Sequence, residues 1–550
     1  MNKLFTILPI IIALALSHSL FAQSNEGELE DIEVVIQKNK DITLPPANRN
    51  YQKISEIPQP EIKPSAQMQF GEHRIGLTAL DPSIRINKLK SEGLDKLYGN
   101  YVRGGFGNYS NTYLEAFLGN KREDKGFYNI YLGHNAFGSG PVEDSDNSRN
   151  HIAANGGIFY DNYSLSAKAF YDRQHYNFYG LYPPRFVPFV INPENEPSDQ
   201  LFNRIGLSTR LSKTDPLDYL NFDLGIGFEH LDDKFNQNEN WLNLNLDSDY
   251  ELNVGKKIKL NARYVLANYS LDTFSNTRHL TEIAPQYVFE TGNLEISGGL
   301  RMSLESDTNL RGDFHLYPLA HVEYKLLDEK LIPYAGIEGG IVTNGLNSFA
   351  TQNPFLDEGN ILSHSNKELE IKGGLRTSLL KKSLIDMYLS YSAIDNLPLF
   401  INNPINNRFL VLYAENASIF TAGLSFNTKP LNNLELGASL EYRDYGFSDT
   451  TEAWHLPSVE SHIYAKFNIK KKIYMNVDIF SINGIFAYTT MEAKRALDDI
   501  LDINLQLEYK FSERFSTFVE LKNILSNEYQ RYLFYDNRGI QARAGLTYTF

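Results

Sequence analysis

The chain has 550 residues, no Cys, 67 acidic against 52 basic side chains, and a formal net charge of −15. The lack of Cys excludes a disulfide scaffold, a Cys-ligated zinc or iron–sulfur site and a thiol nucleophile. The acidic balance argues against nucleic acid as a partner, because phosphate binding needs a basic surface. With 34 Tyr, 34 Phe and a mean hydropathy of −0.36, the chain is aromatic without being hydrophobic overall.

Residues 1–22 predict a secretory signal peptide. A short basic start precedes an apolar run over residues 4–16, which is shorter than the roughly 20 residues of a membrane helix. Leu20-Phe21-Ala22 provides the expected cleavage site. No later apolar run is long enough for a membrane helix, so we expect the mature chain to be periplasmic, secreted, or inserted in an outer membrane as a closed barrel.

Residues 23–97 are expected to form a separate N-terminal segment. Their prolines lie between positions 45 and 82, and the segment has little periodicity, which favours extended conformations. Near its start an acidic lead runs into a short β-prone stretch, Asp31-Ile32-Glu33-Val34-Val35-Ile36.

From residue 98 to the end, apolar and polar residues alternate. Residues 501–511 are apolar at every odd position and polar at every even one, and the pattern recurs over 434–443 and 294–304. Strands of soluble proteins average about five or six residues, whereas strands of about 9–11 residues with apolar outward faces are typical of membrane barrels. The pattern therefore predicts an all-β fold, a transmembrane antiparallel β-barrel over residues 98–550.

The segments with this alternation number 22. One set of connections is short, as at 161–162 and 470–471. The other set contains long loops at 175–200, 341–367, 392–416 and 483–500, with only the first hairpin very short on that side. Short periplasmic turns that alternate with longer outer loops are expected of an outer-membrane barrel. Residues 409–413 are assigned to a loop, because counting them as a barrel strand makes the total odd.

The last predicted strand ends with the chain. Tyr548 and Phe550 lie on its apolar face, and Gln541 and Arg543 on the other. An aromatic C-terminus on an amphipathic strand resembles the signal that is read by the outer-membrane assembly machinery.

The signal peptide, the strand count and Phe550 together resemble the TonB-dependent receptor family of outer-membrane transporters, in a short form of the Bacteroidota type. The resemblance implies solute uptake, and it implies that residues 31–36 act as a TonB box, which pairs as an added strand with a TonB-type energy transducer. The alternative for this stretch is a disordered leader. The family also carries a folded plug domain, for which residues 37–97 are too few and too rich in proline.

A barrel of this width would leak solutes if its lumen were open, so we expect the lumen to be filled. The N-terminal segment, inward-folded loops or a partner chain are the alternatives. Inward-facing charges are expected either to pair with one another or with this filling, or to line a hydrated lumen. They are Glu370, Lys372, Arg376, Glu441, Arg443, Glu508, Lys510 and Arg543.

The aromatic-rich loop over residues 175–189 is the main candidate binding site. Aromatic loops suit stacking against glycans or peptides and the docking of proteins. They also suit an aromatic girdle at the membrane interface, and both interpretations stay open. The candidate residues are Tyr176, Phe178, Tyr179, Tyr182, Arg185 and Phe186.

No catalytic motif stands out. The chain has no H-E-x-x-H pair, no G-x-S-x-G elbow and no P-loop, so we expect neither an enzyme nor a bound cofactor. The acidic loop tips at 143–146 and 232–233 lack EF-hand spacing, and no metal site is predicted there.

Two functions remain as the leading interpretation and its rival, and a passive channel is a third possibility. The first is a TonB-dependent-receptor-like barrel that takes part in solute uptake across the Gram-negative outer membrane. The second is a non-transporting barrel that serves as a subunit of a larger complex. The expected partners are outer-membrane lipid, a TonB-type transducer, and an outer-membrane protein or lipoprotein.

Overall fold

The computed structural model describes residues 99–120, 125–180, 198–215, 218–272, 274–308, 312–327, 330–378, 380, 382–448, 451–489 and 493–550. The expected signal peptide, the segment over residues 23–97 and the TonB-box-like stretch Asp31-Ile32-Glu33-Val34-Val35-Ile36 lie outside these residues. The first strand begins at Tyr101, close to the predicted start of the barrel.

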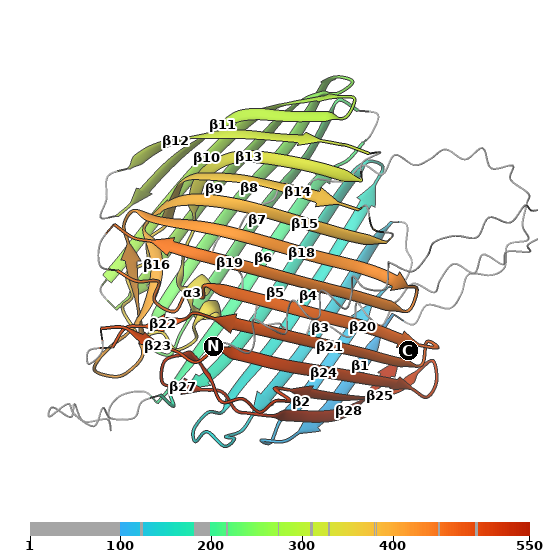
Figure 1. Ribbon diagram of the computed structural model, residues 1–550, viewed down its shortest axis with the longest axis vertical. Coiled ribbons are helices and arrows are strands. Elements are labelled where there is room, and N and C mark those ends of the chain that lie inside the picture. The colour runs from blue at the N-terminus through green and yellow to red at the C-terminus, as the bar shows by residue number, and fades with distance from the viewer. Residues whose placement is uncertain are drawn as a thin grey trace, which may run out of the picture. The chain divides into compact units, whose positions relative to one another are not determined.

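Most of the described chain forms one sheet of 22 strands (Figure 1). The strands in chain order are β1 (Tyr101–Gly107), β2 (Thr112–Gly119), β3 (Gly126–Phe137), β4 (Asn147–Tyr160), β5 (Tyr163–Asn177), β6 (Asp199–Lys213), β7 (Leu220–Asp232), β8 (Gln237–Asn253), β9 (Lys256–Leu271), β10 (Phe274–Thr291), β11 (Leu294–Asp307), β12 (Asp313–Tyr324), β13 (Leu331–Val342), β14 (Ser365–Thr377), β15 (Ser383–Asp395), β18 (Ala417–Leu431), β19 (Leu434–Gly446), β20 (Val459–Ile469), β21 (Ile473–Asn483), β24 (Ile500–Lys510), β25 (Phe515–Lys522) and β28 (Gln541–Thr549).

The sheet closes on itself. Each strand pairs antiparallel with the next barrel strand in the chain, and β28 pairs with β1 from Tyr101↔Thr549 to Gly107↔Arg543. A closed sheet has no edge strand, as a fold in lipid requires. The shortest pairing among the long strands joins β12 to β13 over four residues, from Ala320↔Ile337 to Glu323↔Tyr334. The predicted strand number and the transmembrane barrel are confirmed.

Side chains on the two faces of the wall differ as the alternation predicts. On β24, Leu507 and Tyr509 are exposed on the outer face, whereas Asp502 and Glu508 are buried on the inner face. The outer face therefore suits lipid. No helix in the described part of the chain is long and apolar enough to cross a membrane.

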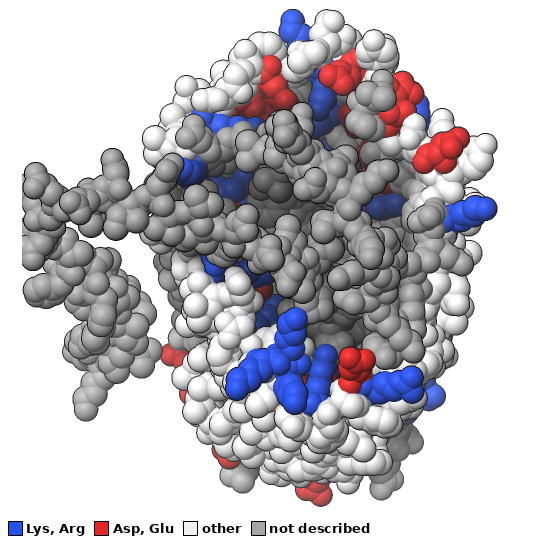
Figure 2. Space-filling view, turned by 90° about the vertical axis from the view of Figure 1, so that its right-hand side faces the viewer, with Lys and Arg blue, Asp and Glu red and all other residues white. Residues whose placement is uncertain are grey.

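The two ends of the barrel differ. At one end, the turn end, strands are joined by short connections such as 161–162 and 292–293. Figure 2 looks onto this end and shows Lys and Arg side chains grouped over part of its rim. The turns and strand ends from β14 to β25 carry Lys382, Lys429, Lys470, Lys471, Lys472 and Arg514.

The opposite, loop end contains the long connections 178–198, 343–364, 396–416 and 484–499. The expectation that only the first hairpin is very short at this end is wrong, since β7 and β8 are joined by residues 233–236 and β9 and β10 by 272–273. These strands continue past the apolar band with polar outward residues such as Asn268 and Thr277, which hydrogen-bond to each other at 2.7 Å. A search for apolar alternation misses such extensions.

Residues 409–413 do not belong to the barrel, as predicted, although they are extended. They lie in β17 (Phe409–Ala414), which pairs with β16 (Leu397–Asn402) in a separate hairpin at the loop end. The even number of barrel strands is therefore preserved.

The wall varies in height around the barrel. The strands beside the closure are short, with 7 residues in β1 and 8 in β2, while β8 and β10 have 17 and 18. The β1–β2 hairpin is thus a low part of the loop-end rim.

Glycine permits close packing where the barrel closes. A Cβ at Gly545 would lie 2.1 Å from the carbonyl oxygen of Gly104 and 2.6 Å from the ring of Phe518. The buried Phe518 ring also covers Gly105 and stacks under the Arg103 guanidinium at 3.8 Å. Small residues are therefore required beneath this ring.

Candidate functional site

Loops from several hairpins fold together at the loop end. We call residues 343–364, 397–414, 453–456 and 529–538 the loop cap. It includes the helix α3 (Leu346–Gln352) and the short strands β16, β17, β26 (Gln530–Tyr532) and β27 (Tyr535–Asp536). In Figure 1 these elements lie at the left end of the strands, opposite the end that bears the C-terminus.

The cap has its own hydrophobic core, which also packs against inward residues of the barrel wall. Phe355 and Tyr535 stack with ring centroids 3.7 Å apart, and Phe409 contacts Tyr532 at 5.4 Å. Burial of several aromatic rings is the main source of stability in such a cluster. The buried residues are Phe178, Phe202, Leu231, Phe235, Tyr269, Leu346, Phe349, Ala350, Phe355, Leu356, Leu362, Phe400, Phe409, Tyr532 and Tyr535.

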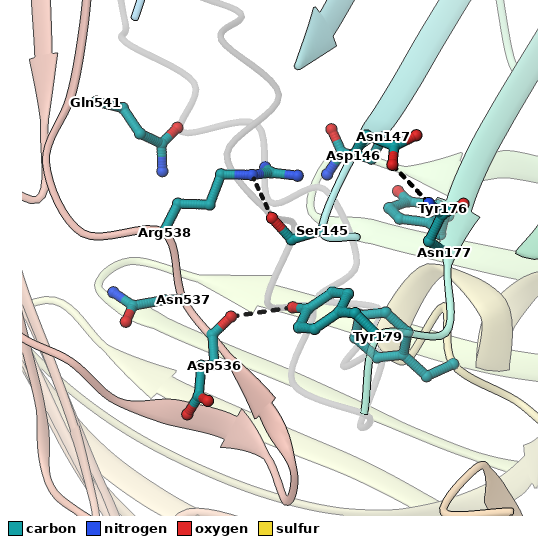
Figure 3. A pocket seen from close by; sticks show the side chains of 11 residues that line it. Ser145, Asp146, Asn147, Tyr176, Asn177, Tyr179, Asp536, Asn537, Arg538 and Gln541 are labelled. Atoms are coloured by element: carbon teal, nitrogen blue, oxygen red, sulfur yellow. Dashed lines mark hydrogen bonds between the residues drawn. The ribbon is translucent and has the colours of Figure 1, made fainter. Parts of the chain in front are cut away.

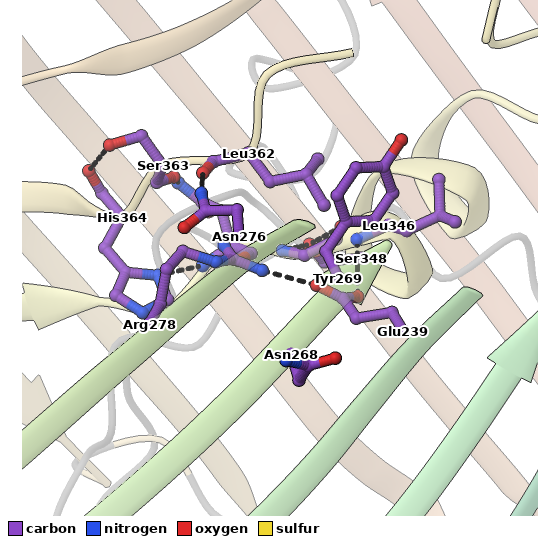
Figure 4. Close-up of polar contacts among 12 residues, drawn as sticks. Glu239, Asn268, Tyr269, Asn276, Arg278, Leu346, Ser348, Leu362, Ser363 and His364 are labelled. Carbon is purple, nitrogen blue, oxygen red and sulfur yellow. Dashed lines mark hydrogen bonds and ion pairs between the residues drawn. The ribbon is translucent and has the colours of Figure 1, made fainter. Parts of the chain in front are cut away.

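A buried ion pair, which we call the cap anchor, fixes the cap to the wall (Figure 4). Arg278 of β10 pairs with Glu239 of β8, and it donates to the carbonyl oxygen of Asn344 at 2.6 Å. The second oxygen of Glu239 accepts the backbone N–H of Leu346 at 2.8 Å. A Cβ at Gly345 would lie 2.4 Å from the Trp241 ring, so glycine allows this approach.

A second set of contacts holds the return of the same loop. The backbone N–H of Asn344 donates to Nδ1 of His364 at 3.2 Å, and the Asn344 amide donates to Ser365 Oγ at 2.8 Å. Burial lowers the pKa of His364 well below its ordinary value, and the nearby guanidiniums of Arg278 and Arg263 act in the same direction. His364 is therefore neutral and serves as an acceptor here.

Asp357 organises the turn of the β16–β17 hairpin. Its carboxylate accepts from Asn403 at 2.6 Å and from Asn406 at 3.2 Å, and it lies 3.5 Å from Arg408. The Asn-rich sequence thus supplies local hydrogen bonds, as turn chemistry predicts.

A cavity of about 210 Å³ lies at the edge of the cap (Figure 3). One wall comes from Ser145, Asp146 and Asn147 before and at the start of β4, together with the end of β5. The opposite wall comes from residues 536–538 and Gln541, and Phe355 completes the lining. The cavity spans the rim above the low β1–β2 hairpin, since β1, β2 and β3 separate β28 from β4 around the barrel.

Arg538 is the cation of this cavity. Its Nε donates to Ser145 Oγ at 3.3 Å, and its guanidinium lies 5.0 Å from the centre of the Phe137 ring. Burial lowers the pKa of Arg538, which nevertheless remains a cation because guanidinium is so basic. Gly539, with φ of +69°, turns the chain directly after it.

Two carboxylates lie in the same lining. Asp146 accepts from the Asn177 amide at 2.5 Å, and Asp536 accepts from Gln530 at 2.8 Å. Tyr179 donates its hydroxyl to the carbonyl oxygen of Asp536 at 3.0 Å, which ties the two walls together. The cavity thus combines one guanidinium, two carboxylates and an aromatic side.

The structure separates the residues predicted in the aromatic loop. Tyr176 and Tyr179 line the cavity, whereas Phe178 is buried in the cap core. These three side chains therefore do not form part of a lipid-facing girdle. Tyr182, Arg185 and Phe186 lie outside the described residues.

Tyr548 lies on the outer face of the final strand. Its ring contacts Phe515 at 4.8 Å and Phe550 at 5.6 Å. This aromatic group is at the turn end, and its role as an assembly signal remains a prediction.

Six of the eight predicted inward charges form ion pairs within the wall, and the other two, Lys372 and Lys510, contact tyrosine side chains. Glu370 contacts Lys367 at 2.5 Å, Arg376 contacts Glu323 at 3.6 Å, and Glu508 contacts Arg103 at 3.8 Å. Further contacts join Arg443 to Glu441 and Glu460, Arg543 to Glu520, Lys372 to the Tyr388 ring and Lys510 to the Tyr474 hydroxyl.

Sequence reasoning missed the cap anchor and the polar half of the cavity. Glu239 and Arg278 occupy ordinary polar positions of alternating strands, and Arg538 lies in a short loop without a motif. The only signal was the presence of charges beside aromatic residues, which is common in barrel loops.

Solved structures show which class of fold this is. The chain is similar to the FrpB iron transporter from Neisseria meningitidis (F3-3 variant), with a TM-score of 0.67 and 12% identity over 83% of this chain and 82% of that one. It is similar to the siderophore receptor PiuA from Acinetobacter baumannii, with a TM-score of 0.62 and 9% identity over 84% and 82%. It is also similar to the ferric yersiniabactin uptake receptor FyuA from Yersinia pestis, with a TM-score of 0.58 and 11% identity over 82% of this chain and 80% of that one.

The fold is therefore the one seen in TonB-dependent receptors such as these, a closed antiparallel barrel of 22 strands. No protein-family model and no curated protein matches the chain.

Proposed function

We propose that the protein is an outer-membrane barrel that takes up a small solute, and that the loop cap is its outer closure. The observation that carries this proposal is that loops from separate hairpins share one buried core across the loop end. A 22-stranded barrel is wide enough to leak solutes unless it is closed. The fold shared with structures named as transporters and receptors supports an uptake role.

In this proposal the loop end faces the medium and the turn end faces the periplasm. Residues 1–22 direct export, residues 23–97 act from the periplasmic side, and residues 98–550 form the barrel. The stretch Asp31-Ile32-Glu33-Val34-Val35-Ile36 recruits a TonB-type transducer by adding a strand to it. The transducer supplies the energy for opening, and the protein has no catalytic role.

Deletion of residues 31–36 tests the energised step. Uptake of the cognate solute by intact cells is expected to fall to the level of a strain without the gene, while the amount of folded barrel in the outer membrane is unchanged. Uptake that proceeds normally after this deletion would overturn the energised mechanism.

The purified wild-type barrel in a planar bilayer tests the closure. It is expected to be electrically silent, because the cap blocks the loop end. Steady conductance of the wild type would instead identify a passive channel.

A non-transporting subunit is the second candidate function. It is favoured by the cap anchor, in which both charged side chains are at most 2% exposed, because such an arrangement resists opening. Purification from native membranes distinguishes the two functions. One stoichiometric outer-membrane protein or lipoprotein partner, together with normal solute uptake in a deletion strain, would support the subunit.

A further inference from the structure

We propose that the cavity beside Arg538 binds a small zwitterion, namely an amino acid or short peptide with a free amino group and a free carboxylate. This inference rests on the proposed uptake function and names the class of its substrate. It depends on the charges of the cavity, its size and the bonds its side chains already make.

Arg538 and Asp146, a cation and an anion of the cavity, do not form an ion pair with each other. Arg538 and Asp146 line the same space, yet among the described residues Arg538 forms no ion pair. Only its Nε has a hydrogen-bond partner, Ser145 Oγ, so its two terminal nitrogens can donate to a ligand. A guanidinium presented in this way suits a carboxylate, which it can bind through two parallel hydrogen bonds.

Asp146 likewise has one carboxylate oxygen available for a ligand. Asn177 occupies Oδ1 of Asp146 at 2.5 Å, which fixes the carboxylate and leaves Oδ2 for a ligand. Figure 3 shows Arg538 and Asp146 on facing walls, with Tyr176 beside Asp146 and Tyr179 below Ser145, its hydroxyl directed at Asp536. An ammonium at Asp146 and a carboxylate at Arg538 would place a ligand across the cavity.

Charge excludes the other simple classes of solute. A purely anionic solute would meet Asp146 and Asp536 as well as Arg538. A neutral sugar would displace water from the guanidinium and the carboxylate without supplying opposite charges, and such desolvation is costly. A zwitterion satisfies both groups at once.

Size points to a small ligand. The cavity of about 210 Å³ equals the liquid volume of about seven water molecules. Sites for drug-sized ligands are about 300–1,000 Å³. An amino acid or a dipeptide is compatible with this space, and its uncharged middle can pack against Tyr179 and Phe355.

Calorimetric titration of the detergent-purified full chain tests the inference. The probes are L-alanyl-L-alanine, its N-acetyl derivative, its C-terminal amide, and maltose as a neutral solute. The dipeptide is expected to bind, and each blocked derivative is expected to bind about ten- to a hundredfold more weakly, as the loss of one charged hydrogen bond predicts. Equal binding of the blocked derivatives, tighter binding of maltose, or no binding of the dipeptide at millimolar concentration would each overturn the proposal.

Variants locate the site. Arg538→Gln and Asp146→Asn are each expected to weaken dipeptide binding by a similar factor, and Arg514→Gln at the turn end is the matched control that leaves it unchanged. Arg538→Lys keeps the positive charge but loses the two-pronged hydrogen-bonding geometry of the guanidinium. Its affinity for the dipeptide is therefore expected to lie between those of the wild type and Arg538→Gln. Unchanged binding in both Arg538→Gln and Asp146→Asn would overturn the assignment. Dipeptide binding with the predicted pattern, but without uptake by cells, would leave this site in place and overturn the proposed transport function.

Discussion

Arg278 and Glu239 face each other across β9, and their ion pair connects the barrel wall to the start of α3. The Arg278 side chain is 2% exposed and that of Glu239 is fully buried. The pair fixes the loop over residues 343–364, which contains α3, without a disulfide bond, since the chain has no Cys.

Removal of one partner of the cap anchor is expected to release the cap from the wall, while the 22-stranded sheet of the barrel remains intact. Arg278→Met leaves Glu239 as an uncompensated buried charge, which costs about 3–5 kcal/mol. Limited proteolysis of the loop over residues 353–361, together with conductance in bilayers, measures the release. Arg210→Met is the matched control, because Arg210 is exposed and its partner Asp223 is only half-buried. Equal resistance of Arg278→Met and the control would contradict a stabilising anchor.

Acid is expected to weaken the cap through His455. Burial lowers the pKa of His455 from 6.5 to about 3, and the Arg531 guanidinium acts in the same direction. Above pH 6.5 the His455 imidazole is neutral both in the packed cap and in the released cap, so the cap has its full stability there. As the pH falls from 6.5 towards 3, the released cap binds a proton that the packed cap does not, and about 3 kcal/mol is lost near pH 4.5.

Fluorescence of Trp454, which precedes His455 and is buried in the described structure, reports this loss. A variant with Trp241→Phe leaves Trp454 as the only indole, because the chain has 2 Trp. His455→Phe in this background removes the titrating group, and its response between pH 6.5 and 4.5 is expected to be flatter than that of the parent. Identical pH profiles would rule out His455 as the cause.

Gly545→Val is expected to disrupt the closure of the barrel. A Cβ at this position meets the Gly104 carbonyl oxygen, which cannot move without disturbing the β28–β1 pairing, and it also meets the fully buried Phe518 ring. The fraction of heat-modifiable, folded barrel on gels is expected to fall several-fold. Gly298→Val in β11 is the control, since a Cβ there has open space within 4 Å. A similar yield of both variants would show that the seam tolerates a side chain.

The orientation can be tested with single cysteines, since the chain has no Cys of its own. Glu358→Cys at the exposed loop end is expected to react with a membrane-impermeant maleimide on intact cells. Lys471→Cys at the turn end is expected to react only after the outer membrane is permeabilised. Both positions should react in detergent, and the reverse pattern on intact cells would invert the topology.

The sequence was sufficient for the wall of the barrel. Period-two alternation in segments such as 501–511 reports a local property, the lipid and lumen faces of one strand, and needs no knowledge of distant residues. The same reasoning failed at the ends of β9 and β10, because the outward residues Asn268 and Thr277 are polar there while inward residues such as Tyr269 are apolar and buried.

The cap could not be predicted in the same way. Phe355 and Tyr535 stack only because closure of the sheet brings the loop after β25 to the loop after β13, and neither loop has a periodic pattern. Arg538 and Asp146 line the same cavity for the same reason. Local composition indicated that residues 175–189 were unusual, but not that Tyr179 would contact Tyr535 and Asp536 near the C-terminus.

In the proposed uptake function, the low β1–β2 hairpin sets the side from which a solute enters. Its strands have 7 and 8 residues, against 17 and 18 in β8 and β10, so the barrel mouth is inclined rather than level. The Arg538 cavity lies above this lowest side. In the proposed uptake function, a solute that enters over this side therefore reaches the cavity without crossing the high side of the mouth.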